Sequence, residues 1–269
     1  MTSEDCLLRV DQANCRINRW AQLRVTHFSL RQGEHWCLFG GNGTGKTSLA
    51  NLIAGKRIES ASYVTYRKEM DPGRDIVMVS FEEQQRLWQR DNRLDMSEYS
   101  DRAEDIGTTV SKLLLSGLTA GADLPNAYQS VVEHLDLGMF LDKGIRFLSS
   151  GQIRRALIGR ALIAAVGDTR KLVVFDDPLE SIDKGSRQRI IECFEALRVS
   201  GFSSLLLCRR QRDILPGTTH LALLENMELT RQGRLTDVLT SQYFRERVAQ
   251  VPRMPDRLPV AERSVASAP

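Results

Sequence analysis

A glycine-rich segment carries the residue types and spacing of a phosphate-binding loop. Residues 40–47 read Gly-Gly-Asn-Gly-Thr-Gly-Lys-Thr, which matches the pattern G-x-x-x-x-G-K-[ST]. Glycines let several backbone N–H groups point at one phosphate, and a following helix N-terminus adds partial positive charge. In such loops the lysine reaches the β- and γ-phosphates and the final hydroxyl ligates Mg²⁺. The segment predicts a nucleoside triphosphate site made by Gly40, Gly41, Asn42, Gly43, Thr44, Gly45, Lys46, Thr47 and Ser48.

The residues on either side of the loop support this prediction. The apolar run 36–39 is expected to be a buried strand, and residues 48–54 are expected to form a helix. The loop therefore lies between a strand and a helix, as the motif requires. A glycine-rich turn that contains lysine by chance is a weak alternative, because the flanks fit as well as the motif.

An aspartate, Asp176, follows the apolar run 172–175, which is expected to be a second buried strand. In P-loop ATPases an acidic residue at this point holds Mg²⁺. An acidic residue at a strand end is also a common turn signal, so Asp176 alone does not decide the matter. Lys46 and Thr47 in the same chain favour the metal-binding role, and Thr47 and Asp176 are the predicted Mg²⁺ ligands.

Small residues precede another helix at 148–152, where the sequence reads Leu-Ser-Ser-Gly-Gln. The N-terminus of that helix is able to meet a phosphate. Taken alone, Ser149 or Ser150 is explained more simply as the helix N-cap. The helix is expected to bury apolar residues spaced by three and four positions, which are Ile153, Ala156, Leu157, Ala161 and Ala164.

The remaining elements predict an α/β fold with a mainly parallel sheet. Residues 7–35 contain short apolar runs typical of antiparallel strands. Further strands are expected at 76–79, with residues 81–85 at its end, and at 204–208 and 221–224. Helices are expected within 86–147 and at 190–197. Strands that alternate with helices after a phosphate-binding loop indicate a parallel sheet. Residues 91–105 are expected to be irregular, and prolines after residue 251 predict a tail or linker.

Composition bears on the compartment and the partners. The 269 residues are 42% hydrophobic with a net charge of +3, which is too balanced to indicate nucleic acid. Five cysteines without a C-x-x-C pair favour a reduced, cytoplasmic setting. The N-terminus lacks the pattern of a secretory signal, and no apolar stretch is as long as a membrane span. We therefore expect a soluble protein, in which any membrane association is made through a partner.

Together, these motifs resemble those of the ATP-binding cassette (ABC) ATPases, in the same order along the chain. Residues 40–47 are similar to the Walker A motif, 148–152 to the signature motif, 172–177 to the Walker B strand and 181–183 to the D-loop. The resemblance implies a P-loop NTPase fold with an N-terminal antiparallel β subdomain. It places the ATP-binding core in residues 1–84 and 148–234, an inserted helical subdomain in 85–147, and a C-terminal helix and Pro-rich tail or linker in 235–269.

The resemblance also implies how the site works. Gln85, or its neighbour Gln84, takes the place of the glutamine that ends a strand, contacts the metal and couples to partners. In this family the Walker motifs of one cassette face the signature motif of another, with ATP and Mg²⁺ between them. A second cassette, identical or a companion, is the expected partner, and a membrane permease is a further one. The residues expected to complete the opposing site are Ser149, Ser150, Gly151 and Gln152.

Four positions depart from the family pattern. Asp177 stands where the family has a catalytic glutamate, and its carboxylate reaches one methylene less far; general-base catalysis depends on reach. Arg209 stands where the family has a histidine. Two alternatives are open for this fixed cation: it faces the phosphate, or it lies on a solvated surface. Ser150 replaces the first signature glycine. The family usually stacks an aromatic side chain from its N-terminal strands on adenine, but residues 15–17 contain none, and Trp20 is the nearest candidate.

Three functions are compatible with these residues. The leading one is an ABC ATPase subunit that drives a partner. The run 88–96, with Phe81 and Glu82, resembles the first cassette of a two-cassette molybdenum-transport group, which implies molybdate-type transport by half of such a protein, cut or encoded separately. The second is a degenerate, non-hydrolysing regulatory cassette, favoured by Asp177 and Arg209. The third is a soluble ABC protein acting on nucleic acid or ribosomes, supported only by the basic cluster 209–212.

Overall fold

The computed structural model describes residues 6–93, 106–117, 124–180 and 182–249. The strands of this part are β1 (Cys6–Arg16), β2 (Gln22–Arg31), β3 (His35–Phe39), β4 (Val64–Tyr66), β5 (Ile76–Val79), β6 (Leu172–Asp176), β7 (Ser203–Cys208), β8 (His220–Glu225) and β9 (Glu228–Arg234). They form one sheet in the order β4-β1-β2-β9-β8-β3-β7-β6-β5.

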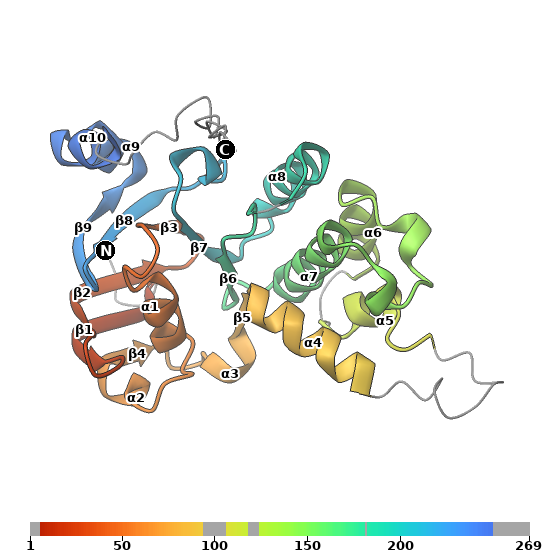
Figure 1. Cartoon of the computed structure of the whole chain (residues 1–269), viewed down its shortest axis with the longest axis horizontal. Helices are drawn as coiled ribbons and strands as arrows, with labels where there is room; N and C mark the ends of the chain where they lie inside the picture. Colours follow the sequence, from red (N-terminus) through yellow and green to blue (C-terminus); the bar gives the residue numbers. More distant parts are fainter. Residues whose placement is uncertain (1–5, 94–105, 118–123, 181, 250–269) are drawn as a thin grey trace, which may run out of the picture.

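Helices cover both faces of this sheet, and α4 to α7 gather on the side of the molecule away from β1 and β2 (Figure 1). The α-helices are α1 (Lys46–Ile53), α2 (Ser60–Tyr63), α3 (Pro72–Asp75), α4 (Phe81–Arg93), α5 (Val110–Leu115), α6 (Leu124–His134), α7 (Ser150–Ala165), α8 (Lys184–Arg198), α9 (Leu235–Thr240) and α10 (Gln242–Ala249). Short 3₁₀ turns are η3 (Gly138–Phe140), η4 (Ile145–Phe147) and η5 (Gln211–Asp213).

Five neighbouring strands, β8, β3, β7, β6 and β5, run parallel to one another. Their residues are largely apolar and buried, as expected when helices cover both faces of a parallel sheet. This arrangement confirms the predicted α/β class. Because the carboxyl ends of parallel strands share one edge, the loops that follow β3, β6 and β7 lie together there. These loops contain the P-loop, Asp177 and Arg209.

The N-terminal strands form the predicted antiparallel arm. β1 pairs antiparallel with β2 and with the short strand β4. β9 pairs antiparallel with β8 and meets β2 at Arg24 and Glu228, so it joins the arm to the parallel strands. The sequence did not predict β9, because its residues are mostly polar and carry no apolar alternation.

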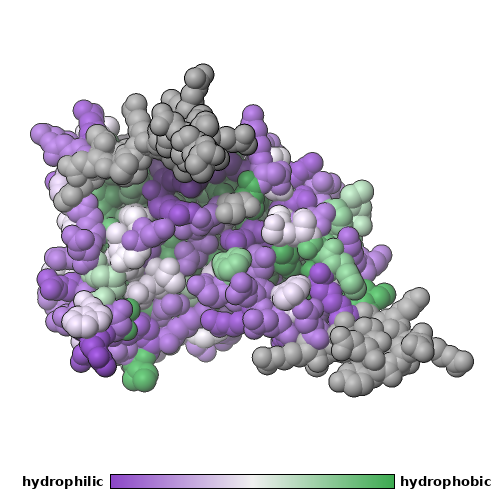
Figure 2. Space-filling model, viewed as in Figure 1, coloured by the Kyte–Doolittle hydropathy of each residue, from purple (hydrophilic) through white to green (hydrophobic). Residues whose placement is uncertain are grey.

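Two apolar clusters hold the sheet to its helices. One lies between the arm, the sheet and α1, and contains Phe28, Leu38 and Leu49. The other lies between the sheet and α5 to α8, and contains Leu157 and Phe175. Polar residues dominate the face shown in Figure 2, where apolar side chains lie in small separate groups. The apolar residues of the chain are thus largely used inside these clusters.

Helix α7 is central to the second cluster. The five residues predicted to be buried along it are buried, and so are residues on its other sides, including Ile158 and Leu162. The helices predicted within residues 86–147 include α5 and α6, and they pack in the same cluster. Helix α7 therefore has no solvated face along most of its length.

The structure corrects one element boundary. Residues 81–85 were expected to close a strand, but they form the first turns of α4. Ser80 explains the early start, since its hydroxyl accepts a hydrogen bond from the Glu83 N–H at 3.2 Å, as a helix N-cap does. Helical structure therefore begins at residue 81 rather than 86. Residues 94–105, Ser181 of the predicted D-loop and the predicted tail beyond residue 249 lie outside the described residues.

A buried ion pair ties the start of β6 to the neighbouring helix α3. Lys171 Nζ donates to Asp75 Oδ1 at 3.1 Å, and the two side chains are 2% and 0% exposed. Burial alone raises the pKa of Asp75, but hydrogen bonds from Arg74, the Asp71 N–H and Lys171 outweigh it and hold this pKa well below its usual range. The pair therefore contributes stability when Asp75 is ionised.

Replacing Asp75 with alanine should lower the free energy of unfolding by about 3–5 kcal/mol, because Lys171 is left buried and unpaired. A lowered folded-state pKa stabilises above the unfolded pKa of about 4 and loses that contribution as pH falls below it. Urea unfolding at pH 7 and at decreasing pH measures both effects. Glu69→Ala is the control, because its exposed pair with Arg67 is worth less than about 1 kcal/mol. Equal losses in the two variants would contradict the prediction.

Candidate nucleotide site

The predicted phosphate-binding loop joins β3 to α1, as expected. Gly45 is the residue before α1 and has a φ of 103°, and a Cβ there would lie 3.2 Å from the side chains of Leu23 and Met227. A Cβ on Gly40 would lie 2.5 Å from the Leu224 carbonyl oxygen. Both positions therefore require glycine, the first for its backbone angle and the second for close backbone approach.

Lys46 is held against the loop that it belongs to. Its Nζ donates to the carbonyl oxygens of Gly40 and Gly41, both at 2.9 Å, and the residue is only 7% exposed. Burial lowers the pKa of Lys46, while the nearby carboxylates of Asp177 and Asp176 act in the opposite direction. The amine is thus held over the loop, and the two carboxylates offset part of its positive charge.

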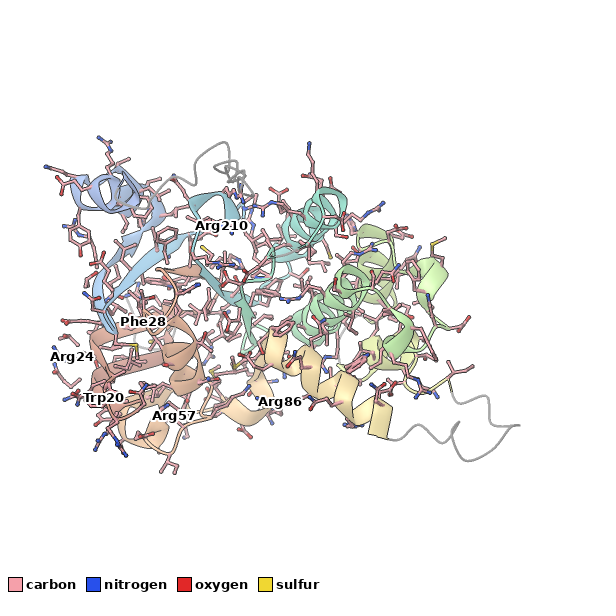
Figure 3. All side chains as sticks on the ribbon, viewed as in Figure 1. Trp20, Arg24, Phe28, Arg57, Arg86 and Arg210 are labelled. Carbon is pink, nitrogen blue, oxygen red and sulfur yellow. The ribbon has the colours of Figure 1, made fainter. Side chains whose placement is uncertain are left out.

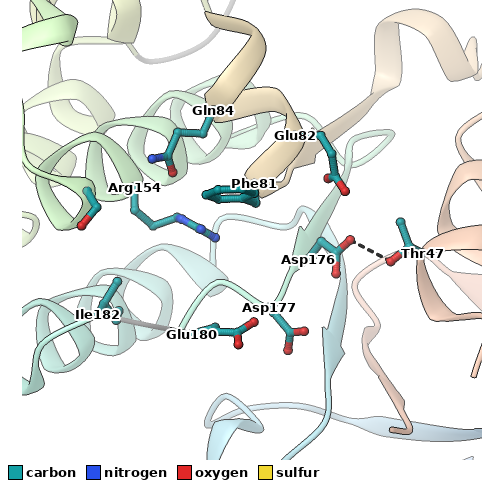
Figure 4. Close-up of a pocket in the computed structure, with 10 residues that line it drawn as sticks. Thr47, Phe81, Glu82, Gln84, Arg154, Asp176, Asp177, Glu180 and Ile182 are labelled. Atoms are coloured by element: carbon teal, nitrogen blue, oxygen red, sulfur yellow. Dashed lines mark hydrogen bonds between the residues drawn. The ribbon is translucent and has the colours of Figure 1, made fainter. Parts of the chain in front are cut away.

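Thr47 and Asp176 come together from α1 and β6. Thr47 Oγ1 donates to Asp176 Oδ2 at 3.0 Å, drawn as the dashed line in Figure 4. Burial raises the pKa of Asp176, and the hydrogen bond from Thr47 counteracts this. A hydroxyl and a carboxylate suit Mg²⁺, which takes one or two carboxylates and completes its shell with phosphates and water. The pair fits the predicted metal role.

Asp177 occupies an unusual backbone conformation directly after β6. Its φ is 44°, in the left-handed region, and its N–H donates to the Leu207 carbonyl at 3.0 Å. Burial raises the pKa of its carboxyl, while Lys46 and Arg209 lower it. Arg209 itself forms an ion pair with Glu180. The predicted phosphate-facing cation is therefore already engaged by an acid at the rim of the site.

The end of β7 supports all of these groups. The Leu207 carbonyl accepts from Asp177, the Cys208 carbonyl accepts from the Gly40 N–H at 3.2 Å, and Arg209 follows next. Three successive residues thus contact the turn after β6, the first residue of the P-loop and Glu180. The spacing between the phosphate-binding loop and Asp177 is set by backbone hydrogen bonds.

A cavity of about 460 Å³ opens beside the Thr47–Asp176 pair (Figure 4). It brings together four of the predicted site residues: Thr47, Ser150, Asp176 and Asp177. Its lining also contains Phe81, Glu82, Gln84, Arg154, Glu180 and Ile182. The charged residues among these, Glu82, Arg154 and Glu180, were not predicted as site residues.

The structure places Gln85 away from this cavity. Gln85 is exposed on α4, while Gln84 lines the cavity and Glu82 lies closer to the Thr47–Asp176 pair (Figure 4). The expectation that Gln85 ends a strand is wrong, because Ser80 starts the helix five residues earlier. Of the two glutamines, the geometry favours Gln84, and the S-x-x-E pattern of Ser80 and Glu83 was the sequence signal for the helix.

The signature-like segment begins α7 with a capping box. Ser149 Oγ accepts from the Gln152 N–H at 3.3 Å, and Gln152 Oε1 accepts from the Ser149 N–H at 2.9 Å. Ser149 is therefore the N-cap, which is the simpler of the two explanations that the sequence allowed. Ser150 and Gly151 are the first residues of the helix and remain free of side-chain capping bonds, and Ser150 faces the cavity.

A second cavity, of about 260 Å³, lies over the P-loop. Residues 43–48 line it together with Ile17, Asn18, Ala21 and Met227. Trp20 is absent from this lining and is 90% exposed at the turn between β1 and β2 (Figure 3). The apolar side chains of this lining outside the loop are Ile17, Ala21 and Met227, none of which the sequence patterns singled out.

A family model described as ABC transporter matches residues 23–180. The chain belongs to the ABC transporter family. The matched segment runs from β2 past Asp177 and includes the P-loop, α4 and the whole of α7. The resemblance drawn from the motifs is confirmed, and the chain is an ATP-binding cassette of the ABC type.

The relatives of this chain are identical to it at about one residue in four. The ABC transporter ATP-binding protein ModF of Escherichia coli is 26% identical over 240 residues, which are 86% of this chain and 45% of ModF. YlmA of Bacillus subtilis, an uncharacterised ABC transporter ATP-binding protein, is 25% identical over 88% of both chains. The molybdenum import ATP-binding protein ModC of Granulibacter bethesdensis is 26% identical over 74% of this chain and 51% of ModC. The chain thus spans less than half the length of ModF.

Solved ABC cassettes share the fold. A nucleotide-free ATP-binding cassette from an ABC transporter aligns with a TM-score of 0.64 at 21% identity, covering 90% of this chain and 98% of that one. A cassette in its ADP conformation aligns with a TM-score of 0.63 at 20% identity, covering 91% and 99%. The predicted P-loop ABC ATPase fold is confirmed. None of the helices in the described ranges has the length and apolar character to cross a membrane.

Proposed function

We propose that the chain is an ABC ATPase subunit that binds MgATP between two head-to-tail cassettes and uses its binding and hydrolysis to drive a partner. The observation that carries this proposal is the convergence of Lys46, Thr47 and Asp176 at one edge of the sheet, with Thr47 Oγ1 and Asp176 Oδ2 3.0 Å apart. This arrangement provides a cation for the phosphates and oxygen ligands for Mg²⁺.

Each residue has a defined part in this proposal. The P-loop N–H groups and Lys46 would bind the phosphates, and Thr47 with Asp176 would hold Mg²⁺, whose charge would offset that of the transferred phosphoryl group. Gln84 lines the cavity on the γ-phosphate side. Asp177 is the candidate general base. Burial raises the pKa of its carboxyl, which brings this pKa closer to the range in which a base accepts a proton.

The partner and the cargo are inferred from relatives. ModC is named as a molybdenum import protein and ModF as an ABC transporter ATP-binding protein. We infer that this chain drives a membrane permease from the cytoplasmic face, in molybdate-type transport. The second cassette is a second copy of this chain or a companion cassette. ATP-dependent oxyanion uptake in cells with and without the gene tests the cargo.

The head-to-tail arrangement predicts association of two copies driven by MgATP. Replacing Ser150 with glutamate should leave the fold intact, because an acid in the first turn stabilises a helix N-terminus. The same carboxylate should abolish the association, since it faces the phosphates of the opposing site. Analytical ultracentrifugation with and without MgATP measures the dimer, and an isothermal titration measures binding.

Met139→Glu is the matched control for this experiment. Met139 is 80% exposed on η3, away from the cavity, so the same added charge should not affect association. A chain that binds MgATP and yet stays monomeric at all concentrations would contradict self-association and point to a companion cassette. A Ser150→Glu variant that still dimerises would contradict the role of the α7 N-terminus.

A degenerate regulatory cassette is a second candidate, and two observations favour it. Asp177 is shorter than the family glutamate, and Arg209 is bound to Glu180 instead of being free for phosphate. Such a chain would bind ATP and complete the site of an active partner without hydrolysing the ATP itself.

The nucleic-acid alternative has lost support. The ion pair between Arg209 and Glu180 partly neutralises the basic cluster 209–212 that suggested this alternative.

A further inference from the structure

The cavity beside the nucleotide site is lined by a buried arginine, Arg154. Arg154 lies in the second turn of α7 and is 8% exposed. Among the described residues, no carboxylate comes within ion-pair distance of its guanidinium, and no hydrogen bond holds it. A buried cation is normally paired, because leaving it unpaired costs free energy. Arg154 therefore has unused capacity to bind an anion.

The adjacent residue on the same helix shows the contrast. Arg155 NH1 donates to the Leu135 carbonyl at 2.6 Å, and Arg155 also forms an ion pair with Asp136. It serves to hold α7 to the end of α6. Arg154 instead extends into the cavity, toward Phe81, Asp176 and Asp177 (Figure 4). The two arginines thus face different parts of the molecule.

The charges around Arg154 explain why a cation is useful here. Four acids line the cavity, and they are Glu82, Asp176, Asp177 and Glu180. Of these, Glu180 is neutralised by Arg209. Burial lowers the pKa of Arg154, and Asp176, Asp177 and Glu82 raise it, so the guanidinium stays protonated. Without Arg154 an incoming phosphate would meet an acidic cavity.

The terminal phosphate of a bound nucleotide would project into this cavity. Thr47 lines both the 260 Å³ cavity over the P-loop and the 460 Å³ cavity that contains Arg154. A nucleotide held by the loop therefore presents its last phosphate at the junction of the two. ADP, which is one phosphate shorter, would leave the larger cavity unfilled.

We propose that Arg154 binds the γ-phosphate of ATP held by the P-loop of the same chain, and that it distinguishes ATP from ADP. This role rests on the proposed function, because it requires ATP in the loop. The bidentate fork of an arginine suits a phosphate, and Arg154 is available because no residue in the described ranges forms an ion pair with it. Arg154 would then do part of the work that Arg209, bound to Glu180, does not.

The test compares ATP-analogue and ADP affinities by isothermal titration with Mg²⁺. The probe is the non-hydrolysable ATP analogue with nitrogen in place of the β–γ bridging oxygen. For Arg154→Gln we expect affinity for this probe to fall by about 10-fold to 100-fold, as for loss of a charge-assisted hydrogen bond, with ADP affinity changed less than about 2-fold. Arg154→Lys should recover part of the loss, because it keeps the charge.

Arg86→Gln is the control, because it removes the same charge from an exposed position on α4 (Figure 3). Equal losses for the probe and ADP in Arg154→Gln would assign a structural role and overturn the proposal, as would unchanged affinity for both. If the wild-type chain binds both nucleotides and Arg154→Gln behaves like it, only the role of Arg154 is overturned. If the wild-type chain binds neither, the proposed function fails as well.

Discussion

Replacing Lys46 with alanine should reduce the affinity for MgATP by at least about 100-fold. Lys46 is the buried cation of the P-loop, and its loss removes charge-assisted hydrogen bonds to two phosphates, each worth about 1.5–3 kcal/mol. The loop N–H groups remain and bind phosphate only weakly by themselves. Isothermal titration with MgATP, or displacement of a fluorescent ATP analogue, measures the loss.

Lys56→Ala is the matched control, because Lys56 is exposed just beyond α1 and should not affect binding. Lys46 also holds the carbonyl groups of Gly40 and Gly41, so thermal unfolding of both variants must show that the fold persists. Retention of tight ATP binding by a folded Lys46→Ala chain would refute the nucleotide site. Weak binding in Lys56→Ala as well would show that net charge, not the loop, is responsible.

Lengthening the side chain at position 177 should raise ATP turnover. Asp177→Glu moves the carboxylate one methylene toward the attacking water, and a well-placed general base contributes about 10²–10⁴-fold. We expect steady-state turnover to rise at least about 10-fold with little change in ATP affinity. The left-handed backbone at this residue favours aspartate, so the variant should also lose about 1 kcal/mol of stability.

Two further variants interpret that result. Asp177→Asn should abolish the residual rate if Asp177 is the base, and Asp142→Glu, on an exposed residue of the helical part, should leave turnover unchanged. A large gain in Asp177→Glu over a wild-type chain that shows no measurable turnover supports the degenerate cassette. Brisk turnover by the wild-type chain excludes that candidate and shows that the shorter carboxylate reaches the water.

The phosphate-binding half of the site was predictable because its signals are local. The P-loop motif and the strand that ends at Asp176 each lie within a few consecutive residues, and parallel strands bring such ends to one edge of the sheet. The antiparallel arm followed in the same way from apolar alternation in residues 7–35. By contrast, β9 is largely polar and gives no apolar alternation, although it forms a hairpin with β8 through the two-residue turn of Asn226 and Met227.

The other half of the cavity was not predictable because it depends on the rotation of α7. Arg154 and Arg155 are chemically identical neighbours, and a helix that is buried on all sides gives no periodic signal to tell which one faces the site. The contacts over the P-loop have a similar cause. Ile17 and Met227 come from different ends of the chain, whereas Trp20 is close in sequence but turns into solvent.

The contacts at the end of β7 have a consequence for how such a chain can diverge. Backbone groups of Leu207 and Cys208 fix the distance between the P-loop and the turn after β6. Side-chain substitutions at positions 177 and 209 leave those backbone bonds in place. The rate of hydrolysis and the affinity for nucleotide are therefore separable properties of this fold. Substitutions at these two positions can slow or abolish hydrolysis while the cassette still binds ATP.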